Sequence, residues 1–179
     1  DKNSGYLKCV LHDEGHLTDI RTGIAGAICA KYLAPKQINK IGILGTGIQA
    51  RMQLEYLALV SDCKDVVVLG RSKKNIDKYI DDMSKMGFFI ESVNSSKELC
   101  SKANLIVTTT SSTKPLINKG DLRKGTHITA VGSDTREKQE LDPNILKMAD
   151  CLVVDSISQC LERGETKKAI DENLINKNN

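Results

Sequence analysis

Short apolar runs alternate with longer segments of helical periodicity along most of the chain. The continuous runs are typical of strands buried on both faces, and apolar residues at every third or fourth position are typical of amphipathic helices. Strands are predicted over residues 40–44, 66–69, 88–93, 105–109, 127–131 and 151–154, and helices over 50–58, 73–86 and 143–148. This alternation requires a parallel sheet covered on both sides, so the predicted fold class is α/β with a doubly wound, mostly parallel sheet.

The first 36 residues have a different pattern, that of a strand followed by a helix. Residues 6–11 form a short β-like run before a polar turn, and we expect Thr18 to be the N-cap of the helix. Gly23 and Gly26 lower the helix propensity of that segment. We therefore expect both glycines to allow close backbone packing against a neighbouring element.

Composition excludes several classes of protein. With 179 residues, 40% of them hydrophobic, the chain is long enough for a domain with a substantial core. Aromatic residues make up 3% and the net charge is +3, so neither base stacking nor an electrostatic grip on nucleic acid is predicted. There is no apolar run long enough to span a bilayer and no signal peptide, which predicts a cytoplasmic protein without membrane contact. A start at Asp1 is compatible with a fragment or a processed product.

The six cysteines do not suggest a disulfide framework or a metal site. No two of them form a C-x-x-C pair, and Cys29 and Cys151 lie inside apolar segments. Buried or half-buried free thiols in a reducing compartment are therefore predicted. The three histidines are not spaced with the cysteines as ligand clusters, so no metal is expected.

A glycine-rich turn between the first buried strand and its helix carries the main functional signal. Residues 45–50 read GTGIQA, a G-x-G-x-x-A pattern in the position of a dinucleotide-binding loop. Gly45 permits the tight turn, Gly47 lets the backbone approach a pyrophosphate, and Ala50 lets the helix pack closely. The helix N-terminus then offers N–H groups and a partial positive charge to the phosphates. The competing interpretation is a plain tight turn.

The end of the second strand bears on the choice between NAD and NADP. An acidic residue there would bind the adenine ribose hydroxyls, but this sequence has Arg71 and Ser72, followed by two lysines. A guanidinium and a hydroxyl suit a 2′-phosphate, so NADP(H) is favoured over NAD(H). The alternative is a solvated helix start at which Ser72 serves only as a cap.

Taken together, the motifs resemble one known family. They are residues 17–23 (LTDIRTG), 45–50 (GTGIQA), 107–110 (VTTT), 125–134 (GTHITAVGSD) and 138–142 (KQELD). This combination is similar to that of the ornithine cyclodeaminase/mu-crystallin family. The resemblance implies a Rossmann-type fold and an NAD(P)-dependent enzyme that transfers hydride at Cα of an L-amino or imino acid. The first hypothesis is an ornithine cyclodeaminase-like activity; the alternatives are an alanine dehydrogenase, a ketimine reductase, or a non-catalytic NADPH-binding protein like mu-crystallin.

The resemblance also implies roles for individual residues. Asp134 matches the family's general acid/base, a role that needs partial burial to bring its pKa toward the operating pH. Substrate-binding roles are implied for Arg21, Ser133 and Lys138, although a solvated role for Lys138 is an equal alternative. Cofactor contacts are implied for Arg21, Thr22, Gly45, Thr46, Gly47, Ile48, Gln49, Arg71, Ser72, Thr110, Ser111, Val131 and Gly132. Arg136-Glu137 replaces the Pro-Gly that other members carry in this loop, which leaves its shape open.

The same resemblance suggests how the chain is divided. Residues 1–36 are expected to be a remnant of the substrate domain, residues 37–165 the NAD(P)-binding domain, and residues 166–179 a polar tail. The family's substrate and dimerisation domain is expected to be largely absent from this sequence. A homodimer is expected for a full-length protein, and the expected partner is a small amino or imino acid.

Overall fold

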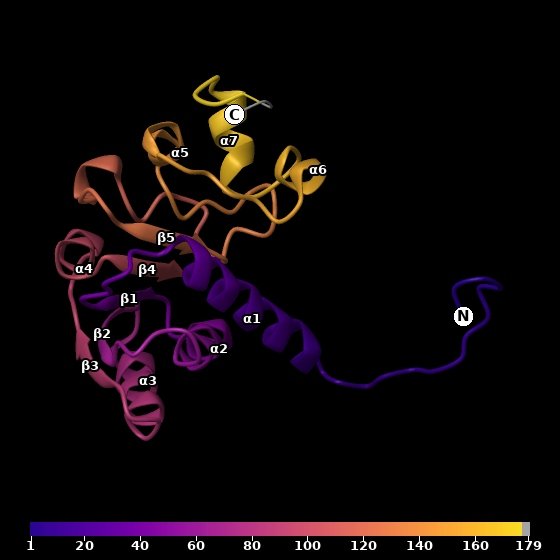
Figure 1. Cartoon of the computed structure of the whole chain (residues 1–179), viewed down its shortest axis with the longest axis horizontal. Coiled ribbons are helices and arrows are strands. Elements are labelled where there is room, and N and C mark those ends of the chain that lie inside the picture. The colour runs from indigo at the N-terminus through magenta and orange to yellow at the C-terminus, as the bar shows by residue number, and fades with distance from the viewer. Residues whose placement is uncertain (177–179) are drawn as a thin grey trace.

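Five parallel strands form the centre of the computed structural model, which describes residues 1–176 (Figure 1). The strands are β1 (Ile41–Leu44), β2 (Asp65–Leu69), β3 (Phe89–Ser92), β4 (Leu105–Thr108) and β5 (His127–Ala130). Their order in the sheet is β3-β2-β1-β4-β5, and all four neighbouring pairs are parallel. The predicted doubly wound α/β fold is thereby confirmed. The strand order reverses between β1 and β4, where open sheets of this kind bind ligands.

Helices cover both faces of the sheet. One face carries α1 (His16–Leu33), α2 (Ile48–Leu57) and α3 (Lys73–Ser84); the other carries α4 (Ser96–Lys102), α5 (Pro143–Met148) and α7 (Glu165–Asp171). The short α6 (Ile157–Cys160) and the 3₁₀ helix η1 (Lys119–Asp121) lie in connections. Strand residues alternate between two buried clusters: Val66 and Val68 pack in the first and Val67 in the second. This two-sided burial explains why the strands read as continuous apolar runs.

Helices α1 and α2 approach each other closely at two glycines. A Cβ atom at Gly23 would lie 2.6 Å from Tyr56 Cδ2, and one at Gly26 would lie 1.8 Å from Gln53 Oε1. The buried Gln53 side chain also donates from Nε2 to the carbonyl of Thr22, at 2.8 Å. The packing role expected for both glycines is confirmed.

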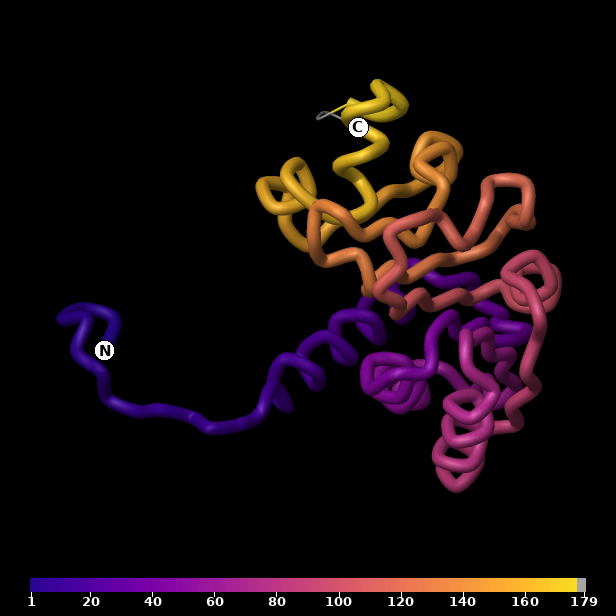
Figure 2. Tube along the Cα trace, turned by 180° about the vertical axis from the view of Figure 1, so that it is seen from behind, coloured from indigo at the N-terminus to yellow at the C-terminus, as the bar shows by residue number. Residues whose placement is uncertain are grey.

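Two expected strands are wrong. Residues 6–11 have no strand structure and belong to an exposed segment that extends away from the rest of the chain (Figure 2). Residues 151–154 also have no strand structure; Leu152 is 38% exposed and Val153 55%. Both runs have the composition of a strand, but β-structure depends on a neighbouring strand and a surface to pack on. Within residues 1–176, β5 is an edge of the sheet.

The helix N-termini differ in part from the expected caps. Helix α1 begins at His16, with Gly15 rather than Thr18 as its N-cap. Ser72 is the N-cap residue of α3, but its side chain makes no capping hydrogen bond. Asp142 is the N-cap of α5, and its side chain accepts from the N–H of Asn144 at 2.9 Å. Over residues 1–176, no helix has the length and apolar character needed to cross a bilayer.

The cysteines are free, but two of them are not buried. Cys100 is buried and Cys29, Cys63 and Cys160 are half-buried, whereas Cys9 and Cys151 are exposed. The exposed pair lies in the two runs that do not form strands, so the expectation of burial is wrong for the same reason as the strands.

The C-terminal segment is more than a polar tail. Helix α7 buries Ala169 and Thr166, and Leu174 and Ile175 pack against the second cluster. Residues 177–179 of the predicted tail lie outside the described residues. Residues 166–176 therefore help to cover the sheet, because their apolar positions face its second side. The division at residues 36 and 165 stays a prediction.

Candidate functional site

The turn after β1 needs glycine at its first position. Gly45 has a φ of 122°, a conformation that L side chains rarely adopt, and its N–H donates to the carbonyl of Leu69 at 2.8 Å. A Cβ atom at this position would lie 2.5 Å from Thr109 Oγ1. The positive φ by itself therefore requires glycine at position 45. Through its contacts with Leu69 and Thr109, Gly45 brings the ends of β1, β2 and β4 together.

The second glycine of the turn is not explained by packing. Gly47 is exposed and is the N-cap of α2, and a Cβ atom there would meet no other atom within 4 Å. Helix α2 has no side-chain cap and no acidic residue in its first turn. Its first N–H groups, together with Ile48, thus face open space at the sheet edge. This arrangement fits a diphosphate, because a helix N-terminus attracts anions and the missing side chain leaves room for them.

Arg51 braces this loop from the helix side, a role that motif reasoning missed. Its Nη1 donates to the carbonyl oxygens of Thr46, at 2.6 Å, and Gly47, at 3.1 Å. Its Nε and Nη2 donate to Asp82 Oδ2 on α3, at 3.0 and 2.7 Å. The guanidinium holds the pKa of Asp82 below its ordinary value. The glycine loop is thereby tied to two helices.

The tip of β2 touches the glycine loop, where the sequence predicts the adenine ribose. A Cβ atom at Gly70 would lie 2.8 Å from Thr46 Cγ2. Arg71, the next residue, is exposed, and Ser72 is half-buried without a capping bond. Arg71 and Ser72 are thus the two residues that come immediately after Gly70, which contacts the glycine loop.

A cavity of about 190 Å³ lies at the ends of β4 and β5. Its lining residues are Gln49, Thr109, Thr110, Ser111, Val131, Gly132 and Lys138. All of them except Thr109 are predicted site residues, so the structure brings together residues from four separate motifs. The volume is below the roughly 300–1,000 Å³ of a drug-sized pocket, so it suits only part of a dinucleotide.

The site residues predicted on α1 do not line this cavity. Gln49 Nε2 donates to Asp19 Oδ1 at 2.7 Å, so its amide group is directed at α1. Thr22 Oγ1 donates to the carbonyl of Thr18 in its own helix, at 2.7 Å. Arg21 is exposed and does not line this cavity. The start of α1 is held beside α2, but the roles of Arg21 and Thr22 stay predictions.

Asp134 lies beyond the carboxyl end of β5, on the sheet edge that carries the glycine loop. Its Oδ1 accepts from Lys138 Nζ at 2.5 Å, and 69% of its side chain is exposed. The expected partial burial is therefore wrong, since the loop leaves this carboxylate in solvent. Ser133 Oγ donates to the carbonyl of Lys138 at 2.8 Å and so closes the loop.

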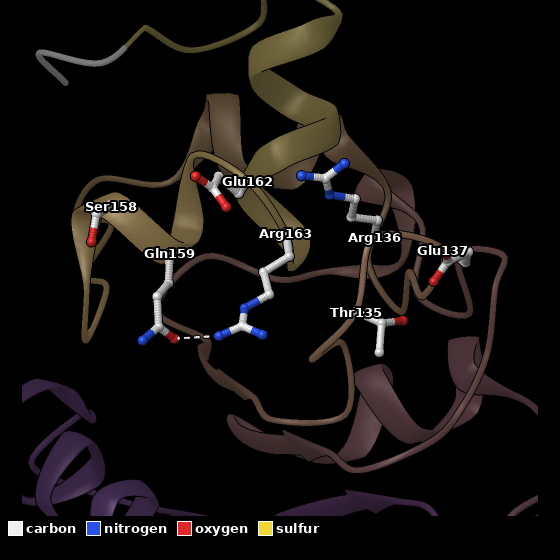
Figure 3. Close-up of a pocket in the computed structure, with 7 residues that line it drawn as sticks. All are labelled: Thr135, Arg136, Glu137, Ser158, Gln159, Glu162 and Arg163. Atoms are coloured by element: carbon white, nitrogen blue, oxygen red, sulfur yellow. Dashed lines mark hydrogen bonds between the residues drawn. The ribbon is translucent and has the colours of Figure 1, made fainter.

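A second, more open cavity of about 550 Å³ adjoins this loop (Figure 3). Its walls come from residues 135–137 and from α6 and the residues after it, among them Glu162 and Arg163. Arg163 Nη2 donates to Gln159 Oε1 at 2.9 Å. Arg136 and Glu137, where the sequence departs from the pattern of the family it resembles, thus form part of a wall that contains both signs of charge.

Glu165 is a half-buried carboxylate that sequence reasoning also missed. Its oxygens accept from the N–H groups of Glu140, at 2.7 Å, and Leu141, at 3.1 Å, and from Gln139 Nε2, at 2.6 Å. Burial, with a smaller contribution from the charge of Glu140, raises the pKa of Glu165 to about 7. In the unfolded chain a glutamate has a pKa of about 4.3.

We expect this shift to make the folded protein less stable as pH rises. The folded state binds the proton of Glu165 more tightly than the unfolded state, so the contribution of Glu165 to the free energy of unfolding is complete below about pH 4.3 and is lost as pH rises through about 7. Urea denaturation at pH 5 and pH 8 should show a decrease on the order of 2 kcal/mol, most of it absent from Glu165→Gln. The exposed Glu162→Gln variant serves as control and should keep the wild-type profile. If the free energy of unfolding decreased equally between pH 5 and pH 8 in both variants, Glu165 would not be the group responsible.

Comparison with known proteins gives a consistent result. The sequence model of the ornithine cyclodeaminase/mu-crystallin family matches residues 1–177. The alanine dehydrogenase of Archaeoglobus fulgidus is 39% identical over 172 residues, which are 96% of this chain and 52% of that protein. The chain thus spans about half the length of the curated relatives it matches.

Solved structures agree with the sequence relatives. The Δ(1)-pyrroline-2-carboxylate reductase of Thermococcus litoralis, in complex with NADH and L-proline, is 34% identical with a TM-score of 0.86 over 91% of this chain and 51% of that one. The iminosuccinate reductase of Paracoccus denitrificans, in complex with NAD⁺, is 34% identical with a TM-score of 0.86 over 92% and 51%. Both share the fold of the present chain over nearly all of its length.

Proposed function

The chain belongs to the ornithine cyclodeaminase/mu-crystallin family, and on that premise we propose that it binds a nicotinamide dinucleotide at the carboxyl edge of its sheet. The proposed activity is hydride transfer at Cα of an L-amino or imino acid, with an ornithine cyclodeaminase-like reaction as the first candidate. Alanine dehydrogenase and ketimine reductase activities are the alternatives, and its relatives include an alanine dehydrogenase, an iminosuccinate reductase and a Δ(1)-pyrroline-2-carboxylate reductase.

The open space in front of α2 is the observation that carries the proposal. Gly47 has no packing reason to be glycine, and the N-terminus of α2 is uncapped, so a diphosphate can approach its N–H groups. Arg51 holds the carbonyl groups of the loop back toward α2 and away from the phosphates. The loop is therefore preorganised for an anion before any ligand arrives.

The other residues would act on either side of this loop. Arg71 and Ser72 would bind the adenine ribose, and the cavity lined by Thr110 and Gly132 would hold the nicotinamide end. A bound nicotinamide supplies the hydride acceptor or donor. Asp134 would take up or release a proton at the substrate nitrogen, and its ion pair with Lys138 would hold the carboxylate in position.

A nucleotide-binding role without turnover is the second candidate. Asp134 is exposed and already paired with Lys138, whereas a general acid/base at neutral pH usually needs a more buried environment. This observation favours a protein that holds the dinucleotide without carrying out the reaction.

Fluorescence titration with NADH and NADPH tests the binding step. We expect saturable binding that is weakened about tenfold or more by Gly47→Ala, because the new methyl group occupies the space a phosphate needs. The free energy of unfolding should change by at most about 1 kcal/mol, since that methyl group touches no other residue. Absence of binding to either nucleotide would remove the proposal.

Turnover with L-ornithine, L-alanine and cyclic imino acids, followed through the absorbance of the reduced nicotinamide, then separates the two candidates. Substrate-dependent oxidation or reduction supports the enzyme. Tight binding with no reaction toward any amino or imino acid supports the binding protein.

We propose further that NADP(H) is the preferred cofactor. Arg71→Ala should weaken NADPH binding by about three- to tenfold and leave NADH binding unchanged, because only NADPH carries the 2′-phosphate that an exposed guanidinium can reach. Lys78→Ala, which removes an exposed cation farther along α3, should alter neither affinity. Equal wild-type affinities for NADH and NADPH would refute the preference.

A further inference from the structure

Glu140 is a fully buried carboxylate held by neutral donors. Its Oε1 accepts from the N–H of Thr110 at 2.5 Å, and its Oε2 accepts from Thr108 Oγ1 at 2.7 Å and from the N–H of Gly132 at 2.9 Å. Among the ion pairs found in residues 1–176, none includes Glu140. Burial raises its pKa against the opposing effect of these hydrogen bonds. A buried carboxylate without a cation is costly unless hydrogen bonds satisfy it, so these three donors are what hold it in place.

The donors come from the tips of two neighbouring strands. Thr108 ends β4, Thr110 follows it by two residues, and Gly132 follows the end of β5. Glu140 is 30 positions from Thr110 but only 8 from Gly132, so it joins segments that are distant in sequence. One side chain thus joins the two strand tips, beside the backbone hydrogen bonds that Val131 and Gly132 donate to the carbonyl of Thr108, at 2.9 and 3.2 Å.

Those tips form the wall of the smaller cavity. Thr110 and Gly132 both line it, and a Cβ atom at Gly132 would lie 2.2 Å from the carbonyl oxygen of Thr110 and 2.6 Å from Glu140 Oε2. The two loops are therefore as close as backbone atoms allow. Any lengthening of the Glu140 bonds would change the width of the cavity.

A second layer of hydrogen bonds holds Glu140 in place. Its N–H donates to Glu165 Oε1 at 2.7 Å, at the first turn of α7. Glu165 also accepts from Gln139 and Leu141, on both sides of Glu140. The segment that carries Glu140 is thus anchored to α7, and the position of its carboxylate is set from outside the cavity.

We propose that Glu140 is a positioning residue that sets the spacing of the β4 and β5 tips and so shapes the nicotinamide half of the dinucleotide site. The inference rests on the proposed function. In a doubly wound sheet the diphosphate lies at the glycine loop and the adenosine lies over β2, so the β4–β5 side receives the other end of the dinucleotide. The three donors to the Glu140 carboxylate all lie on that side.

Comparison of NADH with ADP tests this role, because ADP carries the adenosine and diphosphate without the nicotinamide. In Glu140→Gln an amide NH₂ faces a backbone N–H. We therefore expect the affinity for NADH to fall about tenfold or more, while the affinity for ADP stays within about twofold of the wild-type value. Glu140→Asp keeps the charge but is one methylene too short to reach both tips, and it should show the same split. Exposed Glu137→Gln is the matched control and should leave both affinities unchanged.

A ligand-free measurement keeps the inference testable even if the proposed function fails. In Glu140→Gln the amide hydrogens of Thr110 and Gly132 should exchange at least about tenfold faster, while that of Thr109, which donates to Leu44, keeps its wild-type rate. Equal losses of NADH and ADP affinity, or unchanged exchange at both tips, would overturn the positioning role. If wild-type protein binds neither nucleotide, the proposed function fails and the exchange rates alone decide the role of Glu140.

Discussion

Gly132→Ala is expected to destabilise the fold and to weaken dinucleotide binding together. The added methyl group would lie 2.2 Å from the carbonyl oxygen and 2.5 Å from the nitrogen of Thr110, so the β4 and β5 tips must separate. Overpacking of this kind typically costs about 1–3 kcal/mol. Because both tips line the 190 Å³ cavity, we also expect NADH affinity to fall by about tenfold or more. Urea denaturation and NADH fluorescence titration measure the two effects.

Gly120→Ala is the matched control for this substitution. Gly120 lies in η1, and a Cβ atom there would meet no other atom within 4 Å. Its replacement should leave binding unchanged and alter stability by less than about 1 kcal/mol. If Gly132→Ala behaved like Gly120→Ala, the close approach of the two tips would not exist in solution.

Asp134→Asn is expected to have the largest effect on any turnover. Removal of a general acid/base typically lowers the rate by about 10²–10⁴-fold. The affinity for NADH should stay within about twofold, because Asp134 is not among the residues that line the 190 Å³ cavity and asparagine preserves its shape. Steady-state rates with the best amino or imino acid, together with NADH titration, separate these two quantities.

Helix α3 offers a matched control for the Asp134 variant. Asp81 pairs with Lys85 at 2.6 Å, with the same four-residue spacing as Asp134 and Lys138, and the two aspartates are similarly exposed, at 65% and 69%. Asp81→Asn should leave both turnover and affinity unchanged, so an effect specific to Asp134 is chemical rather than a consequence of losing a surface ion pair. Turnover in Asp134→Asn within about threefold of wild type would exclude the acid/base role.

The parts of the fold that local pattern predicted correctly are those with local causes. The five sheet strands were predicted because burial on both faces leaves a continuous apolar run. The GTGIQA turn was predicted because its glycines are required by the backbone geometry of the same few residues. The helix predicted over residues 143–148 is α5, and it is capped by the adjacent Asp142. Helix α4 was missed although it had a local signal: Ser95 accepts from the N–H of Glu98, while Glu98 accepts from the N–H of Asn94.

The candidate site was predictable where it uses motifs and unpredictable where it uses contacts between them. All residues around the smaller cavity except Thr109 were predicted, but no motif indicated that Glu140 joins Thr110 to Gly132 or that Arg51 joins the glycine loop to α3. Such hydrogen bonds depend on segments that are about 30 positions apart in the chain. Their geometry exists only after the sheet has formed.

The sequence by itself therefore determined the α/β class, the parallel sheet, the glycine turn and the family, since each depends on residue types at short, fixed spacings. Only the tertiary structure decided which apolar runs become strands, how exposed Asp134 is, and which buried carboxylates hold the strand tips. The physical reason is that strand pairing, burial and buried hydrogen bonds each need a second segment. The chain's own spacing does not say which segment that is.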